Sequence, residues 1–381
     1  MALLKVTSPH VRKPTKTADI MRTVIVATLP GIAVLTYYFG WGTLINIVWA
    51  SFVALGCEAL ILKMRKRPIA FYLKDYSALL TAVLLGIALP PHAPWWLTFM
   101  SVGTAIVIAK QLYGGLGFNP FNPAMVGYVV VLISFPTEMS QWAAPRGVLA
   151  EHDPLAFFDS LALTFGFAKE TVDAFTMATP LDVFKQNSAL MVSDLWAKEP
   201  VFGRYGGSGW EYANFAFLLG GLYLLYKKIY TWHAPLSMLI SLTFISAVFY
   251  EGGSSASGGS PLFHIFSGAT LFGAFFIVTD PVTSAVSNRG RIVYGACIGV
   301  LVYLIRVWGN YPDAVAFSVL LMNFCAPFID YYTQPRSFGH ENAGHRSAGH
   351  SSAGHNKSGH GSSAPVNPDH STEKYATEHE D

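Results

Sequence analysis

One segment of the sequence carries hydroxyl side chains in a setting that could accept a covalent group. It reads Asp173-Ala174-Phe175-Thr176-Met177-Ala178-Thr179-Pro180-Leu181. Ala178 leaves space beside the Thr179 hydroxyl, while Pro180 holds its own φ at about −65° and restricts the residue before it. A threonine oxygen presented in this way can accept a phosphoryl group. The same residues also fit an ordinary turn before a short helix that begins at Asp182, so the pattern alone leaves both interpretations open.

A second segment also ends on a threonine that follows an alanine, and it reads Ser267-Gly268-Ala269-Thr270. The residue six positions before Thr270 is His264, whereas the residue six positions before Thr179 is an acid. Thr270 falls within an apolar stretch that should be helical, where Gly268 and Gly273 can let two helices approach closely. We therefore expect helix packing here and favour Thr179 as the acceptor.

The composition indicates where these segments must lie. Hydrophobic residues make up 52% of the 381 positions and charged residues only 13%, far below the roughly 25% of a soluble domain. The apolar residues gather into blocks of a length that crosses a hydrocarbon core of ~30 Å. The sequence predicts an all-α polytopic membrane protein with about ten transmembrane helices, at residues 20–39, 43–62, 77–90, 95–112, 123–136, 211–227, 233–250, 264–280, 292–308 and 313–331.

The basic residues predict the orientation of these helices. Lys and Arg cluster in the N-terminal segment and in loops 63–67, 227–228 and 289–291, while the short loops on the opposite side contain none. Because cytoplasmic loops carry an excess of Lys and Arg, both termini are predicted to be cytoplasmic. This explanation accounts for the basic clusters, so the net charge of +2 does not indicate a nucleic-acid partner.

The blocks divide the chain into five parts with different expected roles. These are a cytoplasmic N-terminal segment (1–19), a first five-helix half (20–136), an outer, periplasmic loop that carries Thr179 (137–209), a second five-helix half (210–335) and a disordered His/Gly/Ser-rich cytoplasmic tail (336–381). Two five-helix halves have opposite orientations, which suggests a 5+5 inverted repeat. The short third and fifth blocks are bounded by prolines and are predicted to be broken or re-entrant helices.

The tail and the cysteines give no pattern typical of a fixed metal or redox centre. Histidines recur every five residues from His340 to His360 among Ser, Ala and Gly. Such a tract can chelate metal but cannot build a core, and we favour a solvated tail. Cys57, Cys297 and Cys325 have no CxxC spacing, so neither a disulfide framework nor an iron–sulfur site is expected. We predict no metal ligands and no catalytic residue.

Two carboxylates lie in the predicted membrane helices, Glu58 in the second block and Asp280 at the end of the eighth. Ionisable groups at such depth are costly, which makes both candidates for an ion path. Each also has a structural interpretation. Glu58 could snorkel or pair with Lys63, and Asp280, which precedes Pro281, could cap a turn. We favour the structural roles and keep the ion path as the alternative.

Three separated segments resemble the NqrB/RnfD family. Residues 110–125 (Lys-Gln-Leu-Tyr-Gly-Gly-Leu-Gly-Phe-Asn-Pro-Phe-Asn-Pro-Ala-Met) and 276–284 (Phe-Ile-Val-Thr-Asp-Pro-Val-Thr-Ser) look like its signature segments. Residues 173–181 resemble its flavinylation motif, in which the last Ser or Thr receives FMN, although Met177 stands where Gly or Ser is commoner. The resemblance covers residues 15–335, and the Thr-Pro-Leu-Asp continuation is more similar to the RnfD branch than to NqrB.

The resemblance implies a subunit of a bacterial inner-membrane ferredoxin:NAD oxidoreductase complex, a translocase that couples electron flow to movement of Na⁺ or H⁺. An FMN transferase would attach FMN to Thr179, and riboflavin is a further cofactor known in relatives. The partners implied are the A, B, C, E and G subunits and membrane lipid. The motif residues expected around the flavin are Asp173, Thr176, Ala178, Pro180 and Leu181. The alternatives are the B subunit of a Na⁺-translocating NADH:quinone reductase and a channel or transporter without flavin.

Overall fold

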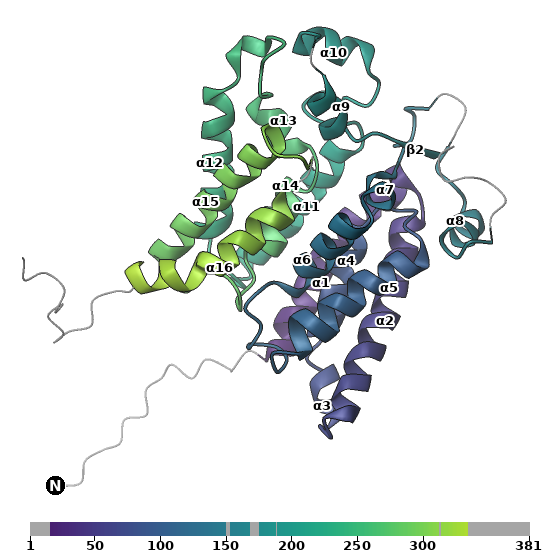
Figure 1. The fold of residues 1–381 in the computed structure, drawn as a ribbon, viewed down its shortest axis with the longest axis vertical. Coiled ribbons are helices and arrows are strands. Elements are labelled where there is room, and N and C mark those ends of the chain that lie inside the picture. The colour runs from purple at the N-terminus through teal and green to yellow at the C-terminus, as the bar shows by residue number, and fades with distance from the viewer. Residues whose placement is uncertain (1–15, 150–152, 168–174, 188, 312–313, 334–381) are drawn as a thin grey trace, which may run out of the picture. The chain divides into compact units, whose positions relative to one another are not determined.

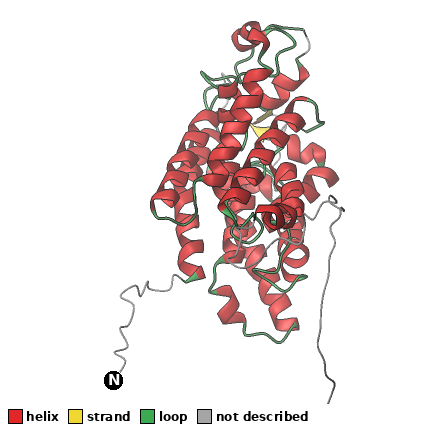
Figure 2. Cartoon of the chain, turned by 90° about the vertical axis from the view of Figure 1, so that its left-hand side faces the viewer, coloured by secondary structure: helices red, strands yellow, loops and turns green. Residues whose placement is uncertain are grey.

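The computed structural model describes residues 16–149, 153–167, 175–187, 189–311 and 314–333. The chain divides into two units, residues 1–335 and 336–381, and every described residue belongs to the first. Figure 2 shows that helices dominate this unit. The strands in the described ranges are β1 (Trp142–Ala143) and β2 (Thr176–Met177), which pair antiparallel.

Helices occupy all five apolar blocks of the first half. Their bounds, together with those of two short connecting helices, are α1 (Thr17–Phe39), α2 (Gly42–Met64), α3 (Ile69–Leu73), α4 (Ser77–Ala88), α5 (Trp95–Gly103), the π-helix η1 (Thr104–Gln111), α6 (Pro123–Ser134) and α7 (Pro136–Ser140). The fourth block is therefore an α-helix that continues as a π-helix. Helix α2 packs against α4, α5 and η1, and Figure 1 shows α2, α4 and α5 together in this half.

The long connection between the halves folds into short elements. They are β1, α8 (Phe157–Thr164), β2, α9 (Pro180–Gln186) and α10 (Val192–Lys198). In the small sheet Trp142 pairs with Met177, and Ala143 pairs with Thr176. This pairing ties the segment before Thr179 to the start of the connection, directly after α7.

Helices also occupy the five blocks of the second half. Their bounds are α11 (Trp210–Tyr226), α12 (His233–Val248), the 3₁₀-helix η3 (Glu251–Gly253), α13 (Pro261–Phe266), α14 (Thr270–Phe272), the π-helix η4 (Gly273–Ile277), α15 (Asn288–Val307) and α16 (Val315–Thr333). Helices α12 and α15 pack closely because Gly295 and Gly299 have no side chain. A Cβ atom at either position would clash with the backbone of α12. The two halves meet where α1 packs on α11 and α6 packs on α16 (Figure 1).

The structure excludes one of the two predicted alternatives for the third and fifth blocks, the broken helix. Helices α4 and α6, in the third and fifth blocks, each run uninterrupted for 12 residues, about 18 Å at 1.5 Å per residue. The eighth block is broken instead, between α13 and α14, where Gly268 has a φ of 61°. Glycine reaches this left-handed conformation without steric cost. Gly268 therefore lies in the break and not on a helix face. A Cβ at Gly273 would lie 2.5 Å from Val315 Cγ1, as the expected close approach of two helices requires.

Length and composition identify membrane-crossing helices in the part of the chain that the structure describes. Four helices are long and apolar enough to cross a bilayer: α1, α2, α15 and α16. Helices α4, α6 and α12 are shorter but apolar. Large apolar side chains such as Phe52 on α2 and Phe324 on α16 are exposed, as expected for surfaces that face lipid. The described unit is therefore a polytopic helical membrane protein.

Candidate functional site

Thr179 is the N-cap residue of helix α9 and belongs to a capping box. Its backbone is extended (φ −69°, ψ 158°). Its Oγ1 donates to Asp182 Oδ2 at 2.6 Å and accepts from Asp182 N at 3.2 Å, while Thr179 N donates to Asp182 Oδ2 at 3.3 Å. Threonine at the N-cap, proline at the first helical position and an acid at the third favour helix initiation at this point. The helix begins at Pro180 and not at Asp182.

The surroundings of the acceptor oxygen differ from the expectation. The sequence predicts an exposed and unhindered hydroxyl, but Thr179 is half-buried and its oxygen is hydrogen-bonded to Asp182. The prediction was wrong because the Thr-Pro-Leu-Asp sequence satisfies its own polar groups within one turn. Ala178 is exposed, as expected for a small residue that leaves one side of Thr179 open.

Thr179 lies at a cavity of about 410 Å³ between the two halves, here called the Thr179 cavity. Its walls come from α1, α4, α6, α7, β1, α9, α11, α14, η4 and α16, from the break after α13 and from the loop before α16. The aromatic side chains in this wall are Tyr128, Trp142, Trp210, Phe217, Phe272 and Tyr311. The rings of Trp142 and Trp210 contact each other with centroids 4.8 Å apart. The cavity is thus a mostly apolar, aromatic-lined space with Thr179 in its wall.

The structure brings only some of the motif residues to this cavity. Pro180 and Leu181 are buried and line it together with Thr179. Thr176 lies in β2, half-buried and paired with Ala143. Asp173 lies outside the described residues. The motif residues with a known position therefore divide between the cavity wall and the small sheet.

Thr270, the other candidate acceptor, is buried and fully engaged. Its Oγ1 donates to the carbonyls of His264 at 2.7 Å and Ser267 at 3.1 Å, and it accepts from Arg306 Nη2 at 2.9 Å. Arg306 also donates to the His264 carbonyl at 2.8 Å. Arg306 thus stabilises the broken end of α13, a role that the sequence did not indicate. Gly268, in the break, lines the Thr179 cavity.

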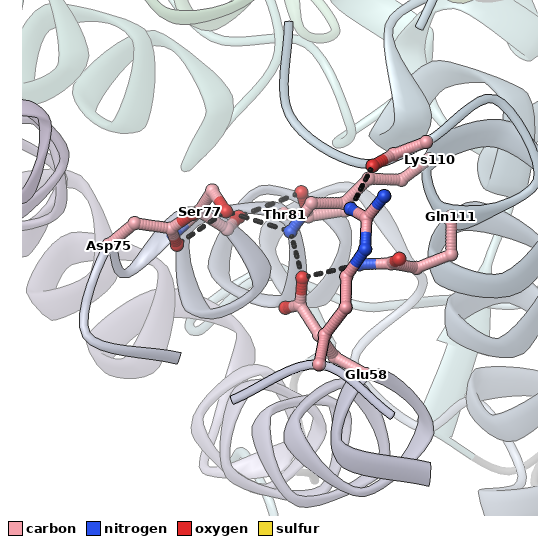
Figure 3. Close-up of polar contacts among 8 residues, drawn as sticks. Glu58, Asp75, Ser77, Thr81, Lys110 and Gln111 are labelled. Atoms are coloured by element: carbon pink, nitrogen blue, oxygen red, sulfur yellow. Dashed lines mark hydrogen bonds and ion pairs between the residues drawn. The ribbon is translucent and has the colours of Figure 1, made fainter. Parts of the chain in front are cut away.

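Glu58 belongs to a buried polar network in the first half (Figure 3). Lys110 Nζ lies 2.7 Å from Glu58 Oε1, and Gln111 Nε2 donates to the same oxygen at 2.8 Å. Glu58, Lys110 and Gln111 are each 2% exposed. The predicted pairing of Glu58 with Lys63 was wrong. Lys63 follows Glu58 by five positions, whereas side chains on one helix meet at spacings of three or four. The sequence could have identified the partner through Lys110, because a cation inside an apolar block requires an anionic partner.

The same network continues from Lys110 to the loop before α4. Lys110 Nζ donates to Ser77 Oγ at 2.7 Å, and Ser77 Oγ donates to Asp75 Oδ1 at 2.6 Å. Ser77 N also donates to Asp75 Oδ1, at 2.7 Å. Ser77 is buried and Asp75 is half-buried. A continuous line of polar groups therefore leads from a loop to the interior (Figure 3).

The two family signature segments meet at a second cavity of about 270 Å³, here called the Lys110 cavity. Asn122 Nδ2 lies 3.5 Å from Asp280 Oδ2, although the two residues are 158 positions apart. The Asp280 carboxylate accepts from Val282 N at 3.3 Å and from Thr283 Oγ1 at 2.7 Å. The turn-capping interpretation of Asp280 is therefore confirmed. In the ranges that the structure describes, no cluster of three His, Cys, Asp or Glu side chains could hold a metal ion.

Comparison with known proteins agrees with this helical membrane fold. The model of the NQR2, RnfD, RnfE family matches residues 5–339. Three relatives carry the name of the D subunit of an ion-translocating oxidoreductase complex. The chain is 55% identical to that of Cellvibrio japonicus over 90% of this chain and 96% of the relative. The identity is 58% for Ectopseudomonas mendocina (89% and 97%) and 56% for Pseudomonas aeruginosa (90% and 98%). The chain belongs to the NQR2, RnfD, RnfE family.

Proposed function

We propose that this chain is the D subunit of an Rnf-type ion-translocating oxidoreductase complex and that it relays electrons through FMN attached to Thr179. Relatives 55–58% identical to it carry the name of that protein, which supports the assignment to the complex. The observation that carries the flavin part is the position of Thr179 at an aromatic-lined cavity of about 410 Å³. Cavities of ~300–1,000 Å³ are usual for cofactors and other small molecules.

The residues around the cavity suit a flat aromatic cofactor. The faces and edges of Trp142, Trp210 and Tyr128 offer contacts that flat rings favour. Leu181 and Phe272 add apolar surface that excludes water. FMN, when bound, supplies reversible electron acceptance, while the protein supplies orientation and the local electrostatics.

Attachment requires the capping box to change. In the proposed step the Thr179 oxygen displaces AMP from FAD, forms a phosphodiester bond to FMN and loses its proton. The esterified oxygen can no longer donate to Asp182 Oδ2, although it can still accept from Asp182 N. The Asp182 carboxylate must then move away from the phosphate, because like charges this close repel each other. The FMN transferase therefore acts on a form in which the start of α9 has opened.

The ten apolar blocks act as transmembrane helices of the bacterial inner membrane, arranged as an inverted repeat, with both termini in the cytoplasm. The loop with Thr179 then faces the periplasm, and the A, B, C, E and G subunits are the partners. Electron flow drives Na⁺ or H⁺ across the membrane, with Glu58 and Asp280 as candidates for the ion path.

A second candidate function is that of the B subunit of a Na⁺-translocating NADH:quinone reductase. The matched family model includes NQR2 proteins as well as RnfD and RnfE proteins, which favours keeping it. The two functions share the flavin and differ in the electron donor and acceptor. Membranes that contain the complex should exchange electrons between ferredoxin and NAD if the first is right, and oxidise NADH with quinone if the second is right. A channel or transporter would carry no flavin at all.

The attachment of FMN to Thr179 can be tested with denatured protein. A phosphodiester bond survives denaturation, so wild-type protein made together with the transferase should fluoresce on a denaturing gel. Thr179→Val should be dark because it lacks the hydroxyl. Thr179→Asn should also be dark, but it keeps a side-chain oxygen for the helix cap and should therefore accumulate normally. Intact-mass measurement should show the added FMN in the wild type and in neither Thr179 variant.

Thr270→Ala is the matched control. It should remain fluorescent, since the Thr270 hydroxyl is buried and bonded to the backbone. A dark Thr270→Ala band beside a fluorescent Thr179→Asn band would move the flavin to α14. A dark wild-type band would remove the flavin from the proposal and favour the transporter.

A further inference from the structure

A line of hydrogen bonds joins the loop before α4 to the buried carboxylate of Glu58 (Figure 3). Its three links are Asp75 Oδ1 to Ser77 Oγ at 2.6 Å, Ser77 Oγ to Lys110 Nζ at 2.7 Å, and Lys110 Nζ to Glu58 Oε1 at 2.7 Å. Each link lies within the ~2.6–3.2 Å over which side chains exchange protons directly. We propose that this line is a proton uptake path, through which protons reach Glu58 from the face that carries Asp75.

The two ends of the path differ in their access to water. Asp75 is half-buried in the turn between α3 and α4, whereas Glu58 and Lys110 are each 2% exposed. The last turn of α2 and the loop before α3 carry four cationic residues, Lys63, Arg65, Lys66 and Arg67, which places this face in the cytoplasm by the positive-inside rule. The path therefore begins at the cytoplasmic face and ends in the interior of the first half.

Proton transfer along this path restores Lys110 and Ser77 to their starting states. The Lys110 ammonium passes one proton to the Glu58 carboxylate, which leaves a neutral amine beside a neutral acid. The Ser77 hydroxyl then gives its proton to the amine and takes one from Asp75, whose carboxylate has first taken that proton from a hydronium ion in solution. Lys110 and Ser77 end unchanged, and Glu58 has gained one proton.

The protonated state also explains a link to electron transfer. Once Glu58 is neutral, the buried Lys110 ammonium has lost its counter-ion, and an uncompensated buried charge is costly. Negative charge that arrives on a redox centre of the complex offsets that cost. Proton uptake by Glu58 is then favoured when the complex receives an electron, and this step rests on the proposed function.

Several details distinguish this arrangement from a purely structural ion pair. Glu58 Oε2 and Gln111 Oε1 are buried with no hydrogen-bond partner within the described ranges, so the pair is not fully satisfied. A structural pair would also need no connection to a partly exposed carboxylate. Lys110 and Ser77 line the Lys110 cavity, which offers a continuation of the path. The other titratable or charged groups that line this cavity are Lys228, Tyr230, Asp280 and Arg291.

Two substitutions interrupt the path with little change in shape. Asp75→Asn keeps an oxygen that accepts from Ser77 but cannot pass on a proton, and Ser77→Ala removes the central hydroxyl. Ser77→Thr restores a hydroxyl and should rescue transport. Ser51→Ala is the matched control, because Ser51 lies on the same helix as Glu58 and its hydroxyl donates to the Ile47 carbonyl of that helix, away from the path.

The experiment uses the whole complex reconstituted in lipid vesicles with a pH-sensitive dye and a sodium-sensitive dye. Asp75→Asn and Ser77→Ala should slow proton transport about tenfold or more, while electron transfer with an uncoupler present and flavin fluorescence stay at the wild-type level. Ser77→Thr and Ser51→Ala should behave as wild type. If Ser77→Ala fails to assemble, Asp75→Asn decides the question.

Three results would overturn the proposal: proton transport at the wild-type rate in Asp75→Asn, equal slowing by Ser51→Ala, or sodium transport without protons in the wild type. Failure of the proposed function is recognised separately, because the wild-type complex would then lack flavin fluorescence or electron transfer.

Discussion

The Thr179 segment and the Glu58 network both place polar groups beside cavities, but the first uses partners close in sequence and the second uses partners far apart. Thr179 and Asp182 satisfy each other within one turn of a short helix, and Thr179 is half-buried. Glu58 and Lys110 come from positions 52 apart in the sequence and contact each other only because α2 and η1 pack together. A local cap can open and close without disturbing the fold. A long-range buried pair is part of the helix packing, so its loss should destabilise the whole first half.

The largest expected effect follows from breaking the buried ion pair. Lys110→Met leaves the Glu58 carboxylate buried without its cation, and Glu58→Gln leaves the ammonium without its anion. Each should lower the free energy of unfolding by about 3–5 kcal/mol. Unfolding by increasing amounts of denaturing detergent, followed by circular dichroism, measures this change.

The double variant provides the control for this comparison. Lys110→Met combined with Glu58→Gln removes both charges, so it should be more stable than either single variant. If the double variant loses the sum of the two single effects, the two side chains do not stabilise each other and the contrast with Thr179 fails.

A buried ionisable side chain should make stability depend on pH. His92 lies in the loop before α5 and is 4% exposed, and burial lowers its pKa to about 4. The unfolded chain binds the proton at higher pH, near 6.5. The folded protein should therefore keep its full stability above that pH and lose up to about 3 kcal/mol as the pH falls toward 4. Thermal unfolding in detergent at several pH values measures this loss.

His92→Gln should flatten that profile, because glutamine has no proton to gain in this pH range. An unchanged profile in this variant would assign the pH dependence to other groups and would remove His92 from the comparison.

The smallest effect is expected at the cap. Thr179→Val removes the oxygen that accepts from Asp182 N and should cost about 1 kcal/mol, whereas Thr179→Asn should cost much less. The same unfolding measurement compares these variants directly with Lys110→Met. A loss at Thr179→Val as large as that of the ion-pair variants would show that the start of α9 supports the wider fold.

The helices were predictable from the sequence because hydropathy is a property of consecutive residues. A helix occupies each of the ten apolar blocks, with ends within a few residues of the predicted ones for α1, α2, α15 and α16. Membrane helices satisfy their own backbone, so apolar length alone predicts them well. The Thr-Pro-Leu-Asp cap was equally readable from the sequence, since all its partners lie within four positions. The same rule would have warned that the Thr179 hydroxyl is engaged.

Only the tertiary structure decided which distant groups meet. The Glu58 partner was assigned to Lys63 from its nearness in sequence, and the structure supplies Lys110 from η1. The helix break was expected beside the prolines of α4 and α6, yet it lies at Gly268, where Arg306 of α15 binds the freed carbonyls. The Thr179 cavity exists because both halves contribute walls to it. Pairing across the fold depends on how helices pack, and no local pattern of residues records that packing.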